Sequence, residues 1–435
     1  MPGSFDEVVL FTSDLIRIDT QNFGGGHPGP GERVAAEYVA ALLDDVGITC
    51  EVYEAAPRRT TLVARWEPAG TDLSLPPLLL HGHTDVVPAV AADWTVPPLS
   101  GAVQDGCVWG RGAVDMKDFD AMLLAVVRDR QRTRRAPRRP IRLVFTADEE
   151  CGGGQGAVWL ARRHPETVAD CTQAVGEVGG FSLTVGADRL YLVQTAEKGI
   201  AWMKLIVEGT AGHGSMRHLD NAVTELAGAV HRLGQHRFPP SLHPAQRAFL
   251  EAAGESLGVE ITADTVEETL GRLGSISRLI AATMSDTVNP TMLEAGYKVN
   301  VIPGLASAHV DGRFLPGRRD EFLATVAEVV GPRVRLEMVS EQASVEADMA
   351  SALVGAMRQS LAPHDPVGRV VPYLLSAGTD AKAWDELGIQ CYGFTPLQLP
   401  PDLDFTGLFH GVDERVPVES LKFGCRVLDT FLDLA

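Results

Sequence analysis

The sequence predicts an α/β protein. Short apolar runs with the length of buried strands alternate with segments of helical periodicity, a pattern typical of that class. The stretch Gly24–Gly31 must be a loop, because so many glycines and prolines sustain neither a helix nor a strand. The expected strands include Thr61–Arg65, Leu78–His81 and Ile141–Thr146, and the expected helices include Glu32–Val46, Asp118–Arg130 and Asn221–Gln235.

The length, net charge and cysteines of the chain exclude several classes of protein. The 435 residues suffice for two or three domains. The 38 Lys and Arg against 57 Asp and Glu give a net charge of −19, which argues against nucleic acid and against an anionic membrane, since both attract basic surfaces. The first residues lack the pattern of a signal peptide, and apolar stretches such as Met122–Val127 are too short to span a membrane. The six scattered cysteines form no CxxC, so we expect free thiols and a cytoplasmic location.

The segment Arg128–Arg139 carries seven arginines and one aspartate. We interpret it as the solvated end of a helix followed by a connector, with an anion site as the less favoured alternative. The segment 197–317 differs from its flanks because it has few paired acids and histidines and ends in a strand-like run. It is a candidate for an inserted domain.

Polar side chains follow the expected strand in LLLHGHTDVVP. His81, His83 and Asp85 share one face of an extended chain, because side chains alternate with period two. A strand that ends in such residues delivers them to the carboxyl edge of the sheet, where α/β proteins place their sites. A structurally satisfied histidine or a helix cap is the alternative.

An aspartate stands between a glycine-rich turn and an apolar helix in WGRGAVDMKDFDAMLLAV. Asp115 follows Gly110 and Gly112, and an N-cap role would be ordinary for aspartate at that place. Asp118 lies nearer to the helix and is the better cap. Asp115 is therefore free for another role.

Acidic residues also end the next expected strand, in IRLVFTADEECGG. Glu149 and Glu150 follow it directly, and two like charges at a buried strand end repel unless a cation lies beside them. Glu177 follows another short apolar run, and His410 lies in a loop before the last helix. Each alone is more often structural, but together these residue types suit zinc, and an Asp that bridges two metals is a known hydrolytic arrangement.

These segments resemble a family of metal-dependent amidohydrolases. That family includes acetylornithine deacetylase, succinyl-diaminopimelate desuccinylase, aminoacylase and glutamate carboxypeptidase. The resemblance extends from about Val8 to the final helix and depends on HGHTDVVP, WGRGAVDMK and TADEE at their spacing. Further matches are AGHGS (211–215), NVIPG (300–304), DGRFLPG (311–317) and SAGTD (376–380).

The resemblance implies a catalytic centre with two zinc ions per subunit, for which cobalt or manganese could substitute. Asp115 would bridge the ions, and a cis peptide bond would follow it. Asp85 would hydrogen-bond His83 and fix its tautomer. Glu149 would act as general base, and His81 would not be a ligand. The ligands would be His83, Asp115 and Glu177 for one zinc and Asp115, Glu150 and His410 for the other.

The resemblance also implies two domains. Residues 1–196 and 318–435 would form the catalytic domain, with a mixed central sheet flanked by helices. Residues 197–317 would form an inserted α+β domain that serves as a lid and makes the contact of a homodimer. His213 would reach the partner's active site and stabilise the oxyanion. Asn300, Arg313 and the backbone around Gly378 would hold the substrate, and the Arg313 fork suits a carboxylate.

The function that follows is hydrolysis of an amide or peptide bond in a small substrate that carries a free carboxylate. Two substrate classes stay open, dipeptides or C-terminal residues on one side and N-acyl amino acids of the acetyl or succinyl type on the other. The long segment from about Pro239 to Asn289 and the acid at Glu177 favour the peptidase and aminoacylase branches. A one-metal hydrolase and a non-catalytic metal-binding scaffold are the remaining alternatives.

Overall fold

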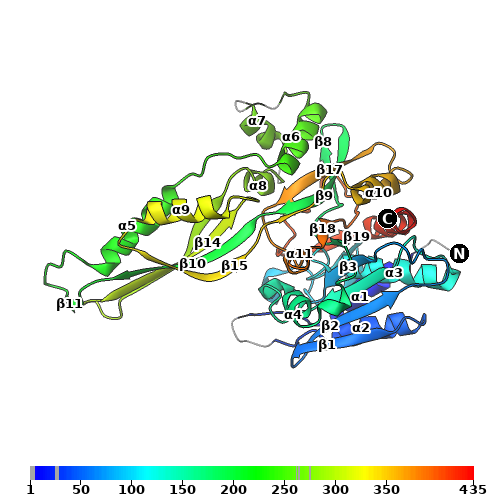
Figure 1. Cartoon of the computed structure of the whole chain (residues 1–435), viewed down its shortest axis with the longest axis horizontal. Helices are drawn as coiled ribbons and strands as arrows, with labels where there is room; N and C mark the ends of the chain where they lie inside the picture. The colour runs from blue at the N-terminus through cyan, green and yellow to red at the C-terminus, as the bar shows by residue number, and fades with distance from the viewer. Residues whose placement is uncertain (1–4, 25–28, 261, 263–264, 274–275) are drawn as a thin grey trace.

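The computed structural model describes residues 5–435 except 25–28, 261, 263, 264, 274 and 275. The centre of the predicted loop Gly24–Gly31 lies outside the described residues. The chain forms two bodies, a ten-stranded mixed sheet covered by helices and an elongated projection built on a second sheet (Figure 1).

Parallel strands form the middle of the large sheet. β3 (Leu78–His83) pairs in parallel with β6 (Ile141–Thr146) on one side and β7 (Gln173–Gly176) on the other, and β18 (Gln390–Gly393) continues in parallel from β7. Antiparallel neighbours make the sheet mixed, and a further parallel pair joins β17 to β9. Its other strands are β1 (Cys50–Ala56), β2 (Arg59–Trp66), β8 (Ser182–Val185), β9 (Asp188–Glu197), β16 (Val345–Glu346) and β17 (Gly368–Leu375).

Helices bury both faces of these central strands. In β3, Leu78 and Leu80 belong to the main core under α3, while Leu79 belongs to the core on the opposite face. A strand buried on both sides needs apolar residues throughout, which explains the continuous runs in the sequence. The main core is covered by α1 (Glu7–Arg17), α2 (Arg33–Asp44), α3 (Lys117–Thr133) and α12 (Val418–Leu434), and the opposite face by α4 (Ala157–Arg163) and α11 (Ala381–Asp385).

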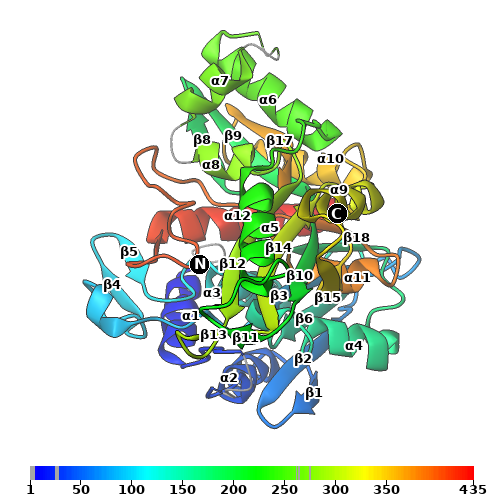
Figure 2. The ribbon, with the colours of Figure 1, turned by 90° about the vertical axis from the view of Figure 1, so that its left-hand side faces the viewer.

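The second sheet has the order β12-β14-β10-β15 and is antiparallel throughout. Two helices cover one of its faces and form a separate core with it. A two-stranded ribbon of β11 and β13 lies at the far end of this projection (Figures 1 and 2). The elements of the projection are β10 (Gly199–Glu208), β11 (Gly212–His213), α5 (Ala222–Gln235), β12 (Thr287–Ala295), β13 (Val301–Ile302), β14 (Leu305–Phe314), α9 (Arg319–Val330) and β15 (Arg335–Gln342).

The chain passes from the large sheet to the second sheet between β9 and β10, beside the expected boundary at 197, but it does not leave the second sheet at 317. Two elements that follow residue 317 are part of the projection: β15 is a strand of the second sheet, and α9 packs in the core formed with that sheet. Conversely, α6 (Pro244–Leu257) lies inside the expected insertion but packs against β17 of the large sheet. The remaining elements are α7 (Val266–Arg272), α8 (Ile276–Ala281), α10 (Ala352–Leu361), and a small sheet of β4 (Ala102–Gln104), β5 (Cys107–Trp109) and β19 (Arg415–Pro417).

The predicted helices and strands are present, with ends shifted by a few residues at most. Asn221 begins α5 as a cap, because its side chain accepts hydrogen bonds from the amides of Val223 and Thr224. The prediction for Asp118 is wrong. α3 begins at Lys117, so Asp118 lies within its first turn, is buried, and its carboxylate makes no hydrogen bond to any described residue.

The prediction of a solvated helix end and connector for Arg128–Arg139 is right only in part: α3 ends at Thr133 and Arg132, Arg134 and Arg138 are exposed, but the arginines at the start of the segment are not. Arg128 and Arg130 are buried and bind acids from distant parts of the chain. Arg128 lies 2.9 Å from Asp45, and Arg130 lies 3.0 Å from Asp429 on α12. Internal carboxylates therefore occupy these arginines, which also argues against the anion site.

The six cysteines are free thiols, as expected. Within the described residues, no helix has the length and apolar character required to cross a bilayer.

Candidate metal centre

The candidate centre lies at the carboxyl edge of the large sheet. His83 ends β3, Glu149 and Glu150 follow β6, and Glu177 follows β7. Since these three strands are parallel neighbours, their carboxyl ends meet at one edge and the side chains converge. Asp115 reaches the same place from the turn before α3.

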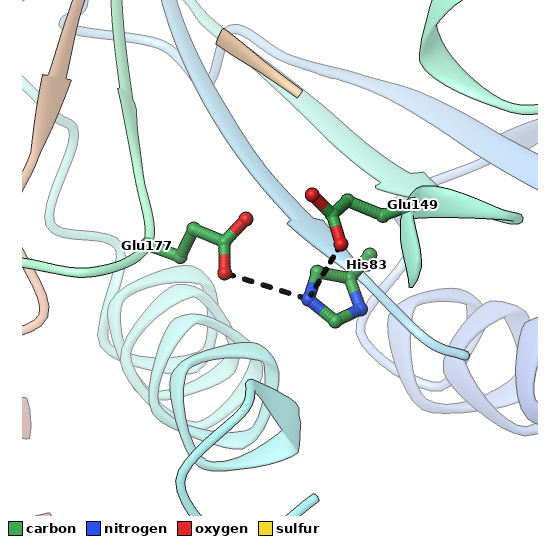
Figure 3. A group of neighbouring side chains, drawn as sticks. All are labelled: His83, Glu149 and Glu177. Atoms are coloured by element: carbon green, nitrogen blue, oxygen red, sulfur yellow. Dashed lines mark ion pairs between the residues drawn. The ribbon is translucent and has the colours of Figure 1, made fainter. Parts of the chain in front are cut away.

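A first cluster surrounds the imidazole of His83. Its Nε2 lies 3.1 Å from Oδ1 of Asp115, 3.5 Å from Glu177 and 3.9 Å from Glu149. Figure 3 shows a carboxylate oxygen of Glu149 and one of Glu177 directed at the same ring nitrogen. The ligand atoms of His83, Glu149 and Glu177 all lie within 4.8 Å of one another, so these three residues could hold one cation.

A second cluster adjoins the first through Asp115. Its Oδ2 lies 3.2 Å from Nε2 of His410, and that nitrogen lies 3.1 Å from Oε2 of Glu150. The other oxygen of Glu150 accepts a hydrogen bond from the amide of Val87 at 3.1 Å. The two oxygens of Asp115 therefore face different histidines, as expected of a bridging carboxylate. The peptide bond between Asp115 and Met116 is cis, as the resemblance implied.

The expected hydrogen bond between His83 and the Asp85 carboxylate is replaced by another. Nδ1 of His83 lies 3.0 Å from the backbone carbonyl of Asp85 and 3.6 Å from its carboxylate. Because a carbonyl only accepts, Nδ1 carries the proton. In the neutral ring, Nε2 then carries a lone pair that points at the carboxylates. Both this nitrogen and the carboxylate oxygens are hydrogen-bond acceptors, so a cation must lie between them to make the arrangement favourable.

The Asp85 carboxylate instead fixes the backbone of the two glutamates. It accepts hydrogen bonds from the amides of Glu149 and Glu150 at 3.1 and 3.2 Å, and from Asn22 at 2.9 Å. Asn22 in turn accepts a hydrogen bond from Arg59 at 2.8 Å. Sequence reasoning missed Asn22 and Arg59, since nothing in their local sequence distinguishes them from other polar residues.

The pKa values of the acids and histidines in the two clusters also indicate that this buried site needs a positive charge. Burial and the neighbouring carboxylates raise the pKa of Glu177 to about 8 and also raise that of Glu149. Hydrogen bonds to Asp115 and Glu150 raise the pKa of His410 to about 10. Burial would lower the pKa of His83, but Glu177 and Asp115 raise it well above its usual value. Without metal, the cluster holds protons that divalent cations would displace, and its oxygen and imidazole donors fit zinc.

A cavity of about 900 Å³ opens beside these clusters. Two of the expected substrate-binding residues line it, Arg313 and Gly378. The guanidinium of Arg313 is held by Asp311, whose two oxygens accept hydrogen bonds at 2.7 and 3.0 Å. Much of the remaining wall is apolar, formed by Val178, Phe181, Ile200, Trp202, Leu375 and Phe409.

The other two expected substrate-binding residues lie elsewhere. His213 is exposed in β11, and the carbonyl of Asn300 accepts a hydrogen bond from Gly214 beside it at 2.9 Å. Neither residue lines the cavity, and Figure 1 shows β11 at the end of the projection away from β3. Within one chain, the structure does not bring them to the candidate metal centre.

Two adjoining clusters of acids and histidines at the carboxyl edge of a mixed sheet, beside a large cavity, define a metal-dependent hydrolase. The comparison with known families is specific: residues 79–434 match the model of Peptidase family M20/M25/M40. The chain belongs to this family and is a hydrolytic enzyme for amide or peptide bonds.

Curated relatives and solved structures agree with this assignment. The chain is 30% identical over 382 residues to a probable carboxypeptidase S-like 2 of Dictyostelium discoideum, covering 83% of this chain and 72% of that protein. It is 30% identical over 389 residues to the mouse N-fatty-acyl-amino acid synthase/hydrolase PM20D1, covering 84% and 75%. Its fold matches an M20 family metallo-carboxypeptidase from Sulfolobus solfataricus with a TM-score of 0.74 and 16% identity, over 99% of both chains.

Proposed function

We propose that this chain is a two-zinc hydrolase of N-acyl amino acids with an apolar acyl group. The observation that carries the substrate class is the cavity of about 900 Å³, which joins the metal centre, an apolar wall and one guanidinium. Its size and wall are those of a small-molecule site. Peptides with an apolar residue before the cleaved bond are the second candidate, supported by the similarity to a carboxypeptidase S-like protein.

The proposed ligands divide between the two clusters. His83, Asp115 and Glu177 hold one zinc, and Asp115 is shared with the second. The short distances from His410 to Asp115 and Glu150 support a second site of three ligands. Bound zinc supplies Lewis-acid chemistry that lowers the pKa of water and polarises a carbonyl. Cobalt and manganese accept the same donors.

Glu149 is the proposed general base. It lies on the cavity wall, and its backbone amide is fixed by Asp85. Its carboxylate takes a proton from the attacking water and delivers it to the leaving nitrogen, acting first as base and then as acid. The distance of 3.9 Å from His83 also leaves Glu149 within reach of a metal, so its role must be tested against that of a ligand.

Arg313 is the proposed anchor of the substrate carboxylate. Asp311 engages its Nε and Nη2 and thereby fixes the plane of the guanidinium. The Nη1 edge remains for a ligand on the cavity side, and a planar fork suits a carboxylate. The acyl chain then extends along the apolar wall at Phe181 and Trp202.

A series of N-acyl derivatives of one amino acid tests the proposal. We expect kcat/KM to rise from acetyl to dodecanoyl, because each buried CH2 contributes about 0.8 kcal/mol, roughly fourfold. Derivatives with the carboxylate converted to an amide should react much more slowly. The measurement is amine release by zinc-loaded enzyme.

Trp202→Ala should reduce the dependence of kcat/KM on acyl chain length. Leu73→Ala is the control, because Leu73 is exposed and lies outside the cavity. Equal rates along the series would exclude an apolar acyl site, and faster cleavage of dipeptides would favour the second candidate.

A homodimer that completes each active site is the second part of the proposal. His213 lies at the tip of the projection and away from the cavity of its own chain. β12 is an edge strand of the second sheet, and most of its residues and those that follow it are exposed. An exposed edge of this kind suits pairing with a second copy of the chain. The partner's lid would then supply His213 as a hydrogen-bond donor to the oxyanion.

Mixing two inactive variants tests the shared site. His213→Ala should be nearly inactive, since loss of one oxyanion donor costs about 10²–10³ in rate, and Glu149→Ala should be inactive as well. The two defects lie in different parts of each composite site. Re-associated mixtures should therefore regain activity through heterodimers with one intact site. Mixed dimers that form by mass spectrometry but stay inactive would contradict the shared site.

A further inference from the structure

Two segments far apart in the chain are tied together beside the candidate metal centre. β19 (Arg415–Pro417) pairs with β5 (Cys107–Trp109), and the amide of Gly110 donates a hydrogen bond to the carbonyl of Glu414 at 2.9 Å. One segment leads into Asp115 and the other follows His410. The geometry between these two residues therefore depends on how the segments are joined.

Glu414 is fully buried and faces the first segment. One of its carboxylate oxygens accepts hydrogen bonds from the amides of Val114 at 2.7 Å and Asp115 at 3.2 Å. The other oxygen accepts from Nη1 of Arg111 at 2.7 Å. The carboxylate thus holds the backbone of Asp115 itself.

Arg111 carries the connection to the second segment. Its Nη2 donates to the backbone carbonyl of His410 at 3.3 Å, and its guanidinium lies over the ring of Trp94, 5.2 Å from the centroid. His410 has a φ of +57°, in the left-handed region that side chains with a Cβ adopt only infrequently. A hydrogen bond to its carbonyl helps to hold this conformation.

We propose that Arg111 and Glu414 are positioning residues that set the separation of Asp115 and His410. They thereby determine the affinity of the metal site formed by Asp115, Glu150 and His410. The inference rests on the proposed ligand assignment. Stability alone does not account for the pair, because a buried ion pair often contributes little against apolar replacements. The rigid fork of arginine, which contacts both segments at once, is suited to fixing geometry.

Metal titration of the stripped full-length protein tests the inference. Wild type should show two zinc-binding steps, and His410→Ala should identify the step that belongs to its side. Glu414→Gln keeps the side-chain size but removes the charge. We expect it to weaken that same step by about 10–100-fold, the usual cost of losing a group that orients metal ligands. The other step should change by less than about threefold. Calorimetry and elemental analysis after dialysis provide the readout.

Two further variants separate positioning from general stability. Arg111→Lys keeps the positive charge but lacks the guanidinium that contacts both segments, so it should weaken the same zinc-binding step. If Glu414→Gln does not fold, this variant alone tests the positioning role. Asp429→Asn removes the buried pair with Arg130 at 3.0 Å and should lower Tm without changing either zinc affinity. Equal weakening of both steps, or a loss of Tm alone, would overturn the inference. Fewer than two zinc ions in wild type would instead refute the proposed two-zinc centre.

Discussion

The two candidate metal-binding histidines are held in opposite ways. His83 ends a central strand and only 1% of its side chain is exposed, whereas His410 lies in a loop and 54% of its side chain is exposed. Hydrogen bonds between parallel strands fix the backbone of His83. The backbone of His410 depends on its contact with Arg111. The sheet thus builds one side of the centre, and long-range contacts between loops build the other.

The difference indicates which side of the centre loses its geometry more easily. A site on a packed strand keeps its geometry, because local opening there costs most of the stability of the domain. A site on an exposed loop is more easily opened and more accessible to water. We therefore expect the His410 side to bind its metal more weakly and to exchange it faster. Three predictions test this comparison.

The largest effect concerns the adjacent glutamates. Glu149→Ala should lower kcat by about 10²–10⁴, the usual contribution of a general acid–base group, and should retain two metals. Glu150→Ala should lose the metal on the His410 side, because Glu150 lies 3.1 Å from His410. Kinetics and elemental analysis on the same samples distinguish the two. Loss of a metal from Glu149→Ala would make Glu149 a ligand on the His83 side.

The pH dependence of metal binding should follow the raised pKa of His410. That pKa is about 10 in the metal-free protein, so the ring carries a proton at pH 7 that the metal must displace. Affinity on this side should therefore fall as the pH falls from 8 to 6, by about tenfold per unit for each proton displaced. Calorimetry in buffers of different ionisation enthalpy measures the release. His410→Ala should abolish the proton release of its step, and a binding enthalpy that is independent of the buffer would contradict the assignment.

The smallest effect is thermal. Metals that bind only the folded chain stabilise it, by about 2.7 kcal/mol each at a hundredfold excess over Kd. Chelation should therefore lower the apparent Tm of wild type by about 5 °C for a chain of this size. His410→Ala should show roughly half this shift, since the His83 side remains. Differential scanning calorimetry with and without chelator measures it, and an unchanged shift would show that His410 holds no metal.

Sequence patterns predicted the central elements because their physical causes are local. The strand at Ile141–Thr146 was predicted with the bounds that it has, since burial on both faces demands an unbroken apolar run. The acids and histidines at strand ends could be expected to meet, because parallel strands share one edge. The residues at the centre of the candidate site therefore follow from the strands that carry them.

The errors arose where the partner of a residue lies far along the chain. Asp429 and Asp433 on α12 bind Arg130, and a local pattern of arginines contains no information about them. The same holds for the Asp85 carboxylate, which binds backbone amides after another strand instead of the neighbouring His83. The second sheet likewise extends past residue 317, because β15 pairs with β10 from beyond it.

The strand order of the projection has a consequence for synthesis on the ribosome. β10 (Gly199–Glu208) is made first, but its partner β14 follows about 100 residues later and β15 later still. At about 5–20 residues per second, β10 waits for roughly 5–20 s before the first of these strands is made. During that time it is an apolar segment with unpaired backbone groups, which other nascent chains could pair with. The interleaved chain path thus leaves the projection exposed to misassembly until its last strand has been made.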